Sequence, residues 1–221
     1  MNKVLIISPH PDDETLGCGG SIFSHNKNGD EVYIIFVTSI SINDGWSAKK
    51  VNERNKKINK IKKIYNFKKS YNFEFPTSKI KYDNINDIIN KISNIFREVK
   101  PNIIYTPFIN DIHTDHQIIS KSVNSCLKKF RYKFLKKALY YEVLSETNLN
   151  FSADVNFHPN VYINITPFLN KKIQAMKIYR SEIKKHPFPR SEESIKALAT
   201  LRGSESGFKY AEAFQLLFEY N

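Results

Sequence analysis

Short apolar runs alternate along the chain with longer segments whose apolar residues recur at helical spacing. The first run, Val4–Ile7, is continuously apolar, as expected for a central strand of a parallel sheet. Ile85, Ile88 and Ile92 fall on one face of a clear amphipathic helix. The pattern predicts strands over residues 4–7, 32–37, 71–75, 103–106, 139–144 and 161–165. It predicts helices over residues 15–26, 48–65, 83–99, 115–127, 167–180 and 191–201.

This alternation is typical of an α/β fold with an open, mostly parallel, Rossmann-like sheet and helices on both faces. The length of 221 residues, 41% of them hydrophobic, fits one compact domain over residues 1–221. Glycines in the first helix would let its backbone pass close to a ligand or a neighbouring strand. Gly203 and Gly207 are expected to form a turn after the last helix. The segment Tyr210–Phe214 is expected to close the structure.

Two clusters of imidazoles and carboxylates follow predicted strands. The first, Ser8–Glu14, comes directly after residues 4–7, and the second, Asn110–His116, lies in the loop beyond residues 103–106. Ligand sites in open α/β sheets lie at the carboxyl ends of the strands, so both clusters are predicted at one edge of the sheet. Together they offer the three protein ligands and the spare base of a catalytic zinc site.

The Pro-His-Pro-Asp-Asp-Glu block, the Asn-Asp-x-His-x-Asp-His block and the stretch Arg202–Phe214 resemble the LmbE-like, or PIG-L, family of zinc-dependent N-acetyl-sugar deacetylases. The resemblance extends over nearly the whole chain. It implies an LmbE-like fold and one zinc ion per chain, held by His10, Asp13 and His116. The sequence leaves open whether the metal in the cell is zinc or iron.

Asp12 is predicted to be the general base. Adjacent residues on a turn point in different directions, so Asp13 can bind the metal while Asp12 accepts a proton from the attacking water. The alternative interpretation of Asp12 is an N-cap of the following helix. Glu14 is predicted to support the site or cap the helix rather than bind the metal.

His113 lies three residues before His116, a spacing that suits a side chain facing the substrate. A protonated His113 would stabilise the oxyanion of the tetrahedral intermediate and then protonate the leaving amine. Asp115 is expected to orient His113 and raise its pKa, with Asp111 as the alternative. An ordinary loop histidine is the other interpretation.

Three residues are predicted to contact the substrate. Arg54 matches a family position that reaches the pocket, with a solvated helix arginine as the alternative. Many family members carry a glutamate where this chain has Lys57, which leaves the role of any ion pair open. Asp44 and Trp46 lie in a loop expected to form a substrate wall, where Trp46 offers a ring face to a sugar or else packs on the surface. Residues 44–52 and 147–160 are expected to set substrate choice.

Lysine and arginine number 34 against 22 acidic residues, a formal charge of +12. No nucleic-acid motif accompanies them, so a lysine-rich solvated surface is favoured over a nucleic-acid partner. Two cysteines indicate no disulfide framework. The N-terminal apolar run is too short for a signal peptide or a membrane span, which predicts a cytoplasmic protein. Homo-oligomerisation is left open.

These features predict a metal-dependent amidohydrolase that removes acetyl from a small N-acetylated sugar or sugar conjugate of the N-acetylhexosamine type. The products would be acetate and a free amine. One alternative within this chemistry is a thiol-precursor glycoside such as N-acetylglucosaminyl-malate. A non-catalytic, basic nucleic-acid-binding module is the alternative from another class.

Overall fold

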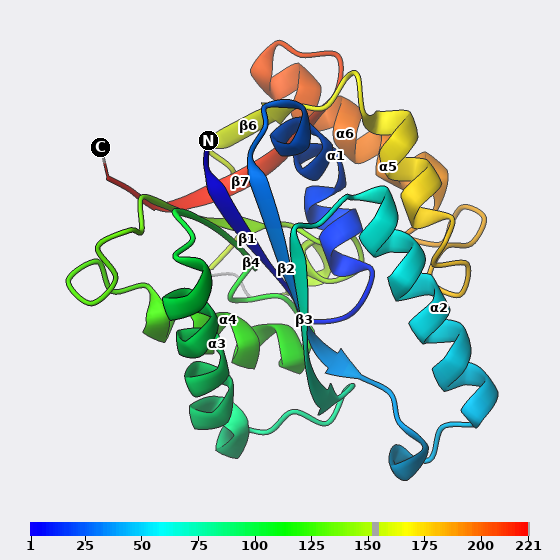
Figure 1. Ribbon diagram of the computed structural model, residues 1–221. Helices are drawn as coiled ribbons and strands as arrows, with labels where there is room; N and C mark the ends of the chain where they lie inside the picture. Colours follow the sequence, from blue (N-terminus) through cyan, green and yellow to red (C-terminus); the bar gives the residue numbers. More distant parts are fainter. Residues whose placement is uncertain (152–154, 221) are drawn as a thin grey trace.

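The computed structural model describes residues 1–151 and 155–220, which form one sheet flanked by helices (Figure 1). The strands are β1 (Lys3–Ser8), β2 (Glu31–Ser39), β3 (Lys69–Pro76), β4 (Ile103–Pro107), β5 (Lys137–Tyr141), β6 (Val161–Asn164) and β7 (Ala211–Glu219). The α-helices are α1 (Asp13–Lys27), α2 (Ala48–Ile64), α3 (Ile85–Val99), α4 (Thr114–Cys126), α5 (Leu169–Met176) and α6 (Glu192–Ser206). Short 3₁₀ helices are η1 (Ile42–Asp44), η2 (Tyr82–Asn84) and η3 (Thr147–Leu149). Within these residues, no helix is long and apolar enough to cross a membrane.

The strand order β3-β2-β1-β4-β5-β7-β6 confirms the predicted open, mostly parallel sheet. The strands from β3 to β5 in this order pair in parallel, and β7 runs antiparallel to both β5 and β6. The chain places β2 and β3 on one side of β1 and then returns to place β4 on the other side. The strand order therefore reverses between β1 and β4, and the loops that follow these two strands carry the two polar clusters. Such switch points are where open α/β sheets bind ligands.

The two faces of the sheet carry separate cores. Val4 and Ile6 of β1 pack on one face with α1, α2, α5 and α6, whereas Leu5 and Ile7 pack on the other with α3 and α4 (Figure 1). Successive side chains of a strand point to opposite faces, so a strand covered on both sides has to be apolar throughout. This explains the continuous apolar run that begins the sequence.

The C-terminal part of the chain differs from the sequence-based prediction. Helix α6 continues through Gly203 to Ser206, and Gly207 ends it with a φ of 75°, in the left-handed conformation. The residues that follow form the strand β7 between β5 and β6, which was not among the predicted strands. Glu212 and Gln215 interrupt the apolar pattern of this strand, which hid it from periodicity alone. Helix α5 is also shorter than predicted.

Two glycines allow α1 to pack closely against its neighbours. A Cβ atom on Gly17 would lie 2.3 Å from the Tyr141 ring, and one on Gly20 would lie 2.4 Å from Ile165. These distances are far below van der Waals contact, so any larger residue would push α1 outward. The glycines therefore serve packing between α1 and the sheet, one of the two roles expected from the sequence.

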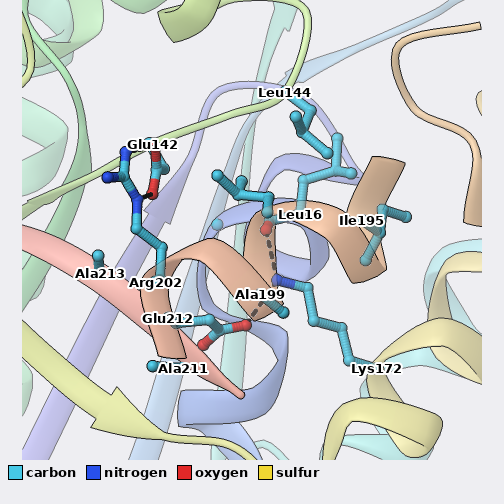
Figure 2. Close-up of a pocket in the computed structure, with 12 residues that line it drawn as sticks. Leu16, Glu142, Leu144, Lys172, Ile195, Ala199, Arg202, Ala211, Glu212 and Ala213 are labelled. Carbon is cyan, nitrogen blue, oxygen red and sulfur yellow. Dashed lines mark hydrogen bonds and ion pairs between the residues drawn. The ribbon is translucent and has the colours of Figure 1, made fainter. Parts of the chain in front are cut away.

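A buried ion pair anchors α1 to the C-terminal half of the chain (Figure 2). Lys172 of α5 donates to the Leu16 carbonyl oxygen and to the Glu212 carboxylate, both at 2.7 Å. Glu212 of β7 also accepts from the backbone N–H groups of Gly20 at 2.8 Å and Ser21 at 2.7 Å. Buried charges are tolerated when paired and hydrogen-bonded in this way. The pair fixes the helix whose first turn carries part of the polar cluster.

Candidate metal centre and active site

Three side-chain atoms from the two loops meet at the switch point of the sheet. Asp13 Oδ2 lies 3.3 Å from His10 Nδ1 and 3.1 Å from His116 Nε2, and the two ring nitrogens are 3.2 Å apart. His10 lies in the turn between β1 and α1, Asp13 begins α1, and His116 lies in the first turn of α4. The structure therefore brings together the three residues predicted as metal ligands.

A carboxylate holds the outer nitrogen of each imidazole. His10 Nε2 lies 3.0 Å from Asp115 Oδ2, and His116 Nδ1 lies 2.8 Å from Asp111 Oδ2. Because an ionised carboxylate only accepts hydrogen bonds, we assign the hydrogens to these outer nitrogens. His10 Nδ1 and His116 Nε2 then turn their lone pairs toward Asp13. Histidines backed by carboxylates in this manner are the usual arrangement at metal sites.

The three inner atoms fit a zinc ion in chemistry and in spacing. Zinc binds imidazole nitrogen and carboxylate oxygen at about 2.0–2.2 Å in a tetrahedral site, which separates neighbouring ligand atoms by about 3.3–3.5 Å. The observed separations of 3.1 to 3.3 Å are close to this spacing. Three protein ligands leave one tetrahedral position for water or substrate, as in catalytic rather than structural zinc sites.

The electrostatics of the cluster also favour a cation. Burial lowers the pKa of His116, but Asp13 and Asp111 raise it by more, so the net pKa lies well above the usual range. Burial raises the pKa of Asp13, but His116 and His10 lower it by more, to well below the usual range. The cluster therefore stabilises positive charge between the carboxylate and the imidazoles, whether a proton or a metal ion supplies it.

Asp12 faces the cleft beside this cluster. It occupies the N-cap position of α1, as the alternative interpretation expected, but its side chain caps no backbone N–H. Its Oδ2 instead accepts a hydrogen bond from Arg190 Nη1 at 2.9 Å. Burial and the neighbouring Asp13 raise the pKa of Asp12 well above its usual range, while Arg190 opposes this shift. A raised carboxylate pKa suits proton transfer near neutral pH.

The backbone at Asp12 is held in an unusual conformation. Its φ of 146° and ψ of −27° lie outside the regions that L-residues favour, at a cost of about 1–3 kcal/mol. The Asp12 N–H donates to the buried Glu14 carboxylate at 3.0 Å. Glu14 also accepts from Ser8 Oγ at 3.0 Å, Thr15 Oγ1 at 2.8 Å and Tyr179 OH at 2.9 Å. These hydrogen bonds occupy the Glu14 carboxylate and support the turn, in line with its predicted role.

His113 lines the cleft, with its ring centre 4.5 Å from that of His10. The prediction that a carboxylate of Asp115 or Asp111 orients it is wrong, because these carboxylates bond to His10 and His116 instead. His113 Nδ1 accepts from the Asp115 backbone N–H at 3.1 Å and caps α4. Burial is the largest cause that lowers the pKa of His113, to about 4. His113 is thus a neutral imidazole whose Nε2 carries the hydrogen, not the protonated group that was predicted.

A cleft of about 720 Å³ opens over the cluster. It brings together most of the predicted site residues, namely His10, Asp12, Asp13, Asp44, Trp46, Arg54 and His113. Asp115 and His116 are fully buried and do not line the cleft itself. Arg54 Nε is buried and has no hydrogen-bond partner among the described residues, and Lys50 Nζ lies 5.2 Å from the centre of the Trp46 ring.

Sequence reasoning missed several residues of this cleft. Arg190 comes from the loop between α5 and α6, and nothing in the sequence pairs it with Asp12. Glu182 lies on the same loop, 3.7 Å from Arg190. Glu146 also lines the cleft and follows β5 at the carboxyl edge of the sheet. Because ligand sites lie at this edge, its position after a predicted strand could have marked it as a site residue. In the predicted specificity loop 147–160, residues 152–154 lie outside the described residues.

Two curated proteins resemble the chain over most of their length. A diacetylchitobiose deacetylase from Thermococcus kodakarensis is 23% identical over 98% of this chain and 84% of its own length. A probable N-acetyl-α-D-glucosaminyl L-malate deacetylase 2 from Bacillus cereus is 24% identical over 81% of this chain and 83% of its own. Both names describe deacetylases of N-acetylglucosamine-containing molecules.

Solved structures share the fold. The conserved protein TT1542 from Thermus thermophilus superposes with a TM-score of 0.79 and 23% identity, covering 100% of this chain and 97% of that one. A teicoplanin deacetylase in its zinc-inhibited form gives a TM-score of 0.76 at 15% identity over 99% of both chains. Residues 5–127, more than half of the chain, match the family described as PIG-L, GlcNAc-PI de-N-acetylase. The chain belongs to the PIG-L family of N-acetyl-sugar deacetylases.

Proposed function

We propose that this chain is a zinc-dependent hydrolase that removes the acetyl group from an N-acetylhexosamine unit of a sugar conjugate. The observation that carries the proposal is the convergence of His10 Nδ1, Asp13 Oδ2 and His116 Nε2 within 3.1 to 3.3 Å. Asp12 and His113 line the cleft directly beside these atoms. Membership of a deacetylase family supports the same chemistry.

A zinc ion held by these three residues would polarise the acetamide carbonyl and lower the pKa of the attacking water. Asp12 takes the proton that this water loses as its oxygen bonds to the carbonyl carbon. His113 donates a hydrogen bond from its Nε2–H group to the carbonyl oxygen, where negative charge develops. As the C–N bond breaks, the proton on Asp12 passes to the leaving nitrogen, giving acetate and a free amine.

Arg190 is proposed to position the base. Its hydrogen bond at 2.9 Å fixes the direction of the Asp12 carboxylate, and its charge favours the ionised form. The cleft wall would hold the sugar: Trp46 offers a ring face, while Asp44 and Arg54 offer hydrogen-bonding groups. We call the three metal ligands, together with Asp12 and His113, the floor of the cleft. The floor is proposed to carry out the chemistry, whereas the wall residues bind the sugar.

The identity of the conjugate divides the proposal into two groups of substrates. The relative from Thermococcus kodakarensis is named for a chitobiose derivative, and the Bacillus cereus relative for an N-acetylglucosaminyl malate. The same floor serves both groups, because both present an acetamide on a hexosamine. We propose N-acetylhexosamine conjugates as the substrate class, with one zinc ion per chain.

An acetate-release assay on zinc-loaded protein tests this function. The substrates are N,N′-diacetylchitobiose, N-acetylglucosaminyl-malate, UDP-N-acetylglucosamine and a lipid-linked N-acetylhexosamine. We expect acetate from at least one of them, and none from the metal-free protein. If the zinc-loaded protein with one bound equivalent released acetate from none, the proposed function would be wrong.

A further inference from the structure

Helix α2 is one of the strongly basic segments of the chain. Its 17 residues contain eight lysines or arginines and one glutamate, a net charge of +7 out of +12 for the whole sequence. Helix α3, which has 15 residues and the same number of asparagines as α2, carries two basic and two acidic residues. The two helices therefore differ sharply in net charge.

The charged helix borders a groove that is continuous with the active-site cleft. The cleft shares Trp46, Lys50 and Arg54 with an adjoining depression of about 240 Å³. That depression shares Glu53 and Lys57 with a third one of about 560 Å³. We call the third depression the α2 groove; it is lined by Glu53, Lys56, Lys57, Lys60, Lys177, Ile178 and Arg180. Its lining residues come from α2 and from the segment that follows α5. Figure 1 shows α2 at the outside of the molecule.

The charges of the α2 groove are largely uncompensated. Five of its side chains are cationic and one is anionic. Lys177 pairs with Glu192 at 2.7 Å, and Lys57 donates to Ser181 Oγ at 3.1 Å. Within the described part of the chain, Lys56, Lys60 and Arg180 form no ion pair. Such a set of free cations beside a cleft attracts negatively charged ligands.

The spacing of these cations selects an extended ligand. Residues on a helix rise by about 1.5 Å each, so the basic residues from Lys50 to Lys60 span about 15 Å. A lone phosphate or a malate carboxylate would meet only one or two of them. A chain with charges repeated along its length would meet several at once, and the groove continues from the cleft in which the sugar would be bound.

We propose that the α2 groove binds the remainder of an anionic oligosaccharide whose N-acetylhexosamine unit occupies the cleft. This inference rests on the proposed function, since it assigns the substrate class of that site. A nucleic acid is the less suitable polyanion, because none of the seven residues lining the groove is aromatic. Proteins that bind single-stranded nucleic acid generally stack the bases on aromatic side chains.

Matched variants of one helix test this assignment. Lys56→Gln/Lys60→Gln removes two groove charges, whereas Lys49→Gln/Lys63→Gln removes two exposed charges of α2 that line none of the three depressions. The substrates are a tetrasaccharide of alternating glucuronic acid and N-acetylglucosamine, neutral chitotetraose of equal length, and UDP-N-acetylglucosamine. Zinc-loaded protein is used throughout, at low and high salt.

We expect the anionic tetrasaccharide to have the highest kcat/KM at low salt and to lose that advantage at high salt. The groove variant should lower its kcat/KM by roughly fivefold, while the control variant and the reaction with chitotetraose change by less than about twofold. Deacetylation of chitotetraose without preference for the anionic chain, or equal effects of both variants, would overturn the groove assignment and leave the proposed function intact. A preference for UDP-N-acetylglucosamine would also overturn it.

Direct binding separates failure of the groove from failure of the enzyme. If neither these substrates nor those of the acetate-release assay above are deacetylated, the proposed function fails, and fluorescence anisotropy of the labelled tetrasaccharide then tests the groove alone. Binding weakened by Lys56→Gln/Lys60→Gln but not by the control variant supports the groove. Equal binding by both variants, or tighter binding of a single-stranded oligonucleotide than of the tetrasaccharide, contradicts it.

Discussion

The floor of the cleft and the α2 groove use charge in opposite ways. On the floor, each histidine ligand lies between two carboxylates, at 2.8 to 3.3 Å. His10 contacts Asp115 and Asp13, and His116 contacts Asp111 and Asp13. In the groove, Lys56 and Lys60 are exposed, and neither forms an ion pair within the described residues. The floor is buried and fixed, whereas the groove is open to solvent.

This contrast indicates where chemistry and selectivity are encoded. Buried charged groups interact strongly, so removing one partner costs much interaction energy. Exposed ion pairs are screened by solvent, and each contributes little interaction energy. Floor variants should therefore lower turnover on every substrate. Variants of the wall or the groove should alter the binding of particular substrates and leave the metal and the chemical step in place.

Removing a metal ligand should have the largest effect. His116→Ala leaves two protein ligands, so we expect loss of bound zinc and a fall in kcat of about 10³-fold or more on all substrates. Metal analysis of the purified protein together with acetate release measures both. His158→Ala, an exposed histidine far along the sequence, is the control and should retain both properties. Full zinc content in His116→Ala would remove this residue from the ligand set.

Removing the base should separate metal binding from turnover. Asp12→Asn keeps the size of the side chain and should retain zinc, while kcat falls by about 10²- to 10⁴-fold because the proton acceptor is lost. The zinc content and the kcat of the same preparation provide the measurement. A variant that lost zinc but kept its activity per bound metal would make Asp12 a ligand.

The partner of the base should matter less than the base itself. Arg190→Met removes the hydrogen bond to Asp12, and we expect kcat to fall by about tenfold or more at unchanged zinc content, with little change in KM. Arg190→Lys keeps the charge and should recover part of the loss. If both variants raised KM with kcat unchanged, Arg190 would bind substrate instead of positioning Asp12.

The wall should give the smallest effect. Trp46→Ala removes a ring face and should raise KM by about threefold to tenfold with kcat nearly unchanged, whereas Trp46→Phe should stay close to the parent protein. Steady-state kinetics on N,N′-diacetylchitobiose measure this effect. An equal loss of kcat in Trp46→Ala would place Trp46 with the floor, and the proposed separation of chemistry from selectivity would not hold.

The sequence predicts most of the fold because the central strands and their helices follow simple periodicities. Val4–Ile7 is apolar throughout because it is covered on both faces, and the two clusters meet because each follows a strand at the switch point. Strand β7 was not predicted because Glu212 interrupts its apolar pattern. This buried glutamate accepts hydrogen bonds from the backbone of α1. An ion pair across the molecule leaves no local pattern.

In the candidate site too, residues within short motifs were predictable, whereas contacts set by the fold were not. His10, Asp13 and His116 are recognisable because short motifs carry them. The partner of His113 was not predictable, because Asp115 and Asp111 are equally near in sequence and only the fold directs their carboxylates to His10 and His116. Arg190 reaches Asp12 from 178 residues away, which no motif reports.

Amide hydrolysis by this chain is proposed to depend on one metal ion held by the floor. The decisive experiment is to titrate zinc into the metal-free protein and follow acetate release from N,N′-diacetylchitobiose, N-acetylglucosaminyl-malate and the anionic tetrasaccharide. We expect activity on at least one of these to rise in proportion to bound zinc, to level off at one equivalent per chain, and to be absent throughout in Asp13→Ala. Acetate release that is independent of zinc, or that persists in Asp13→Ala, would show that the floor does not act through a bound metal.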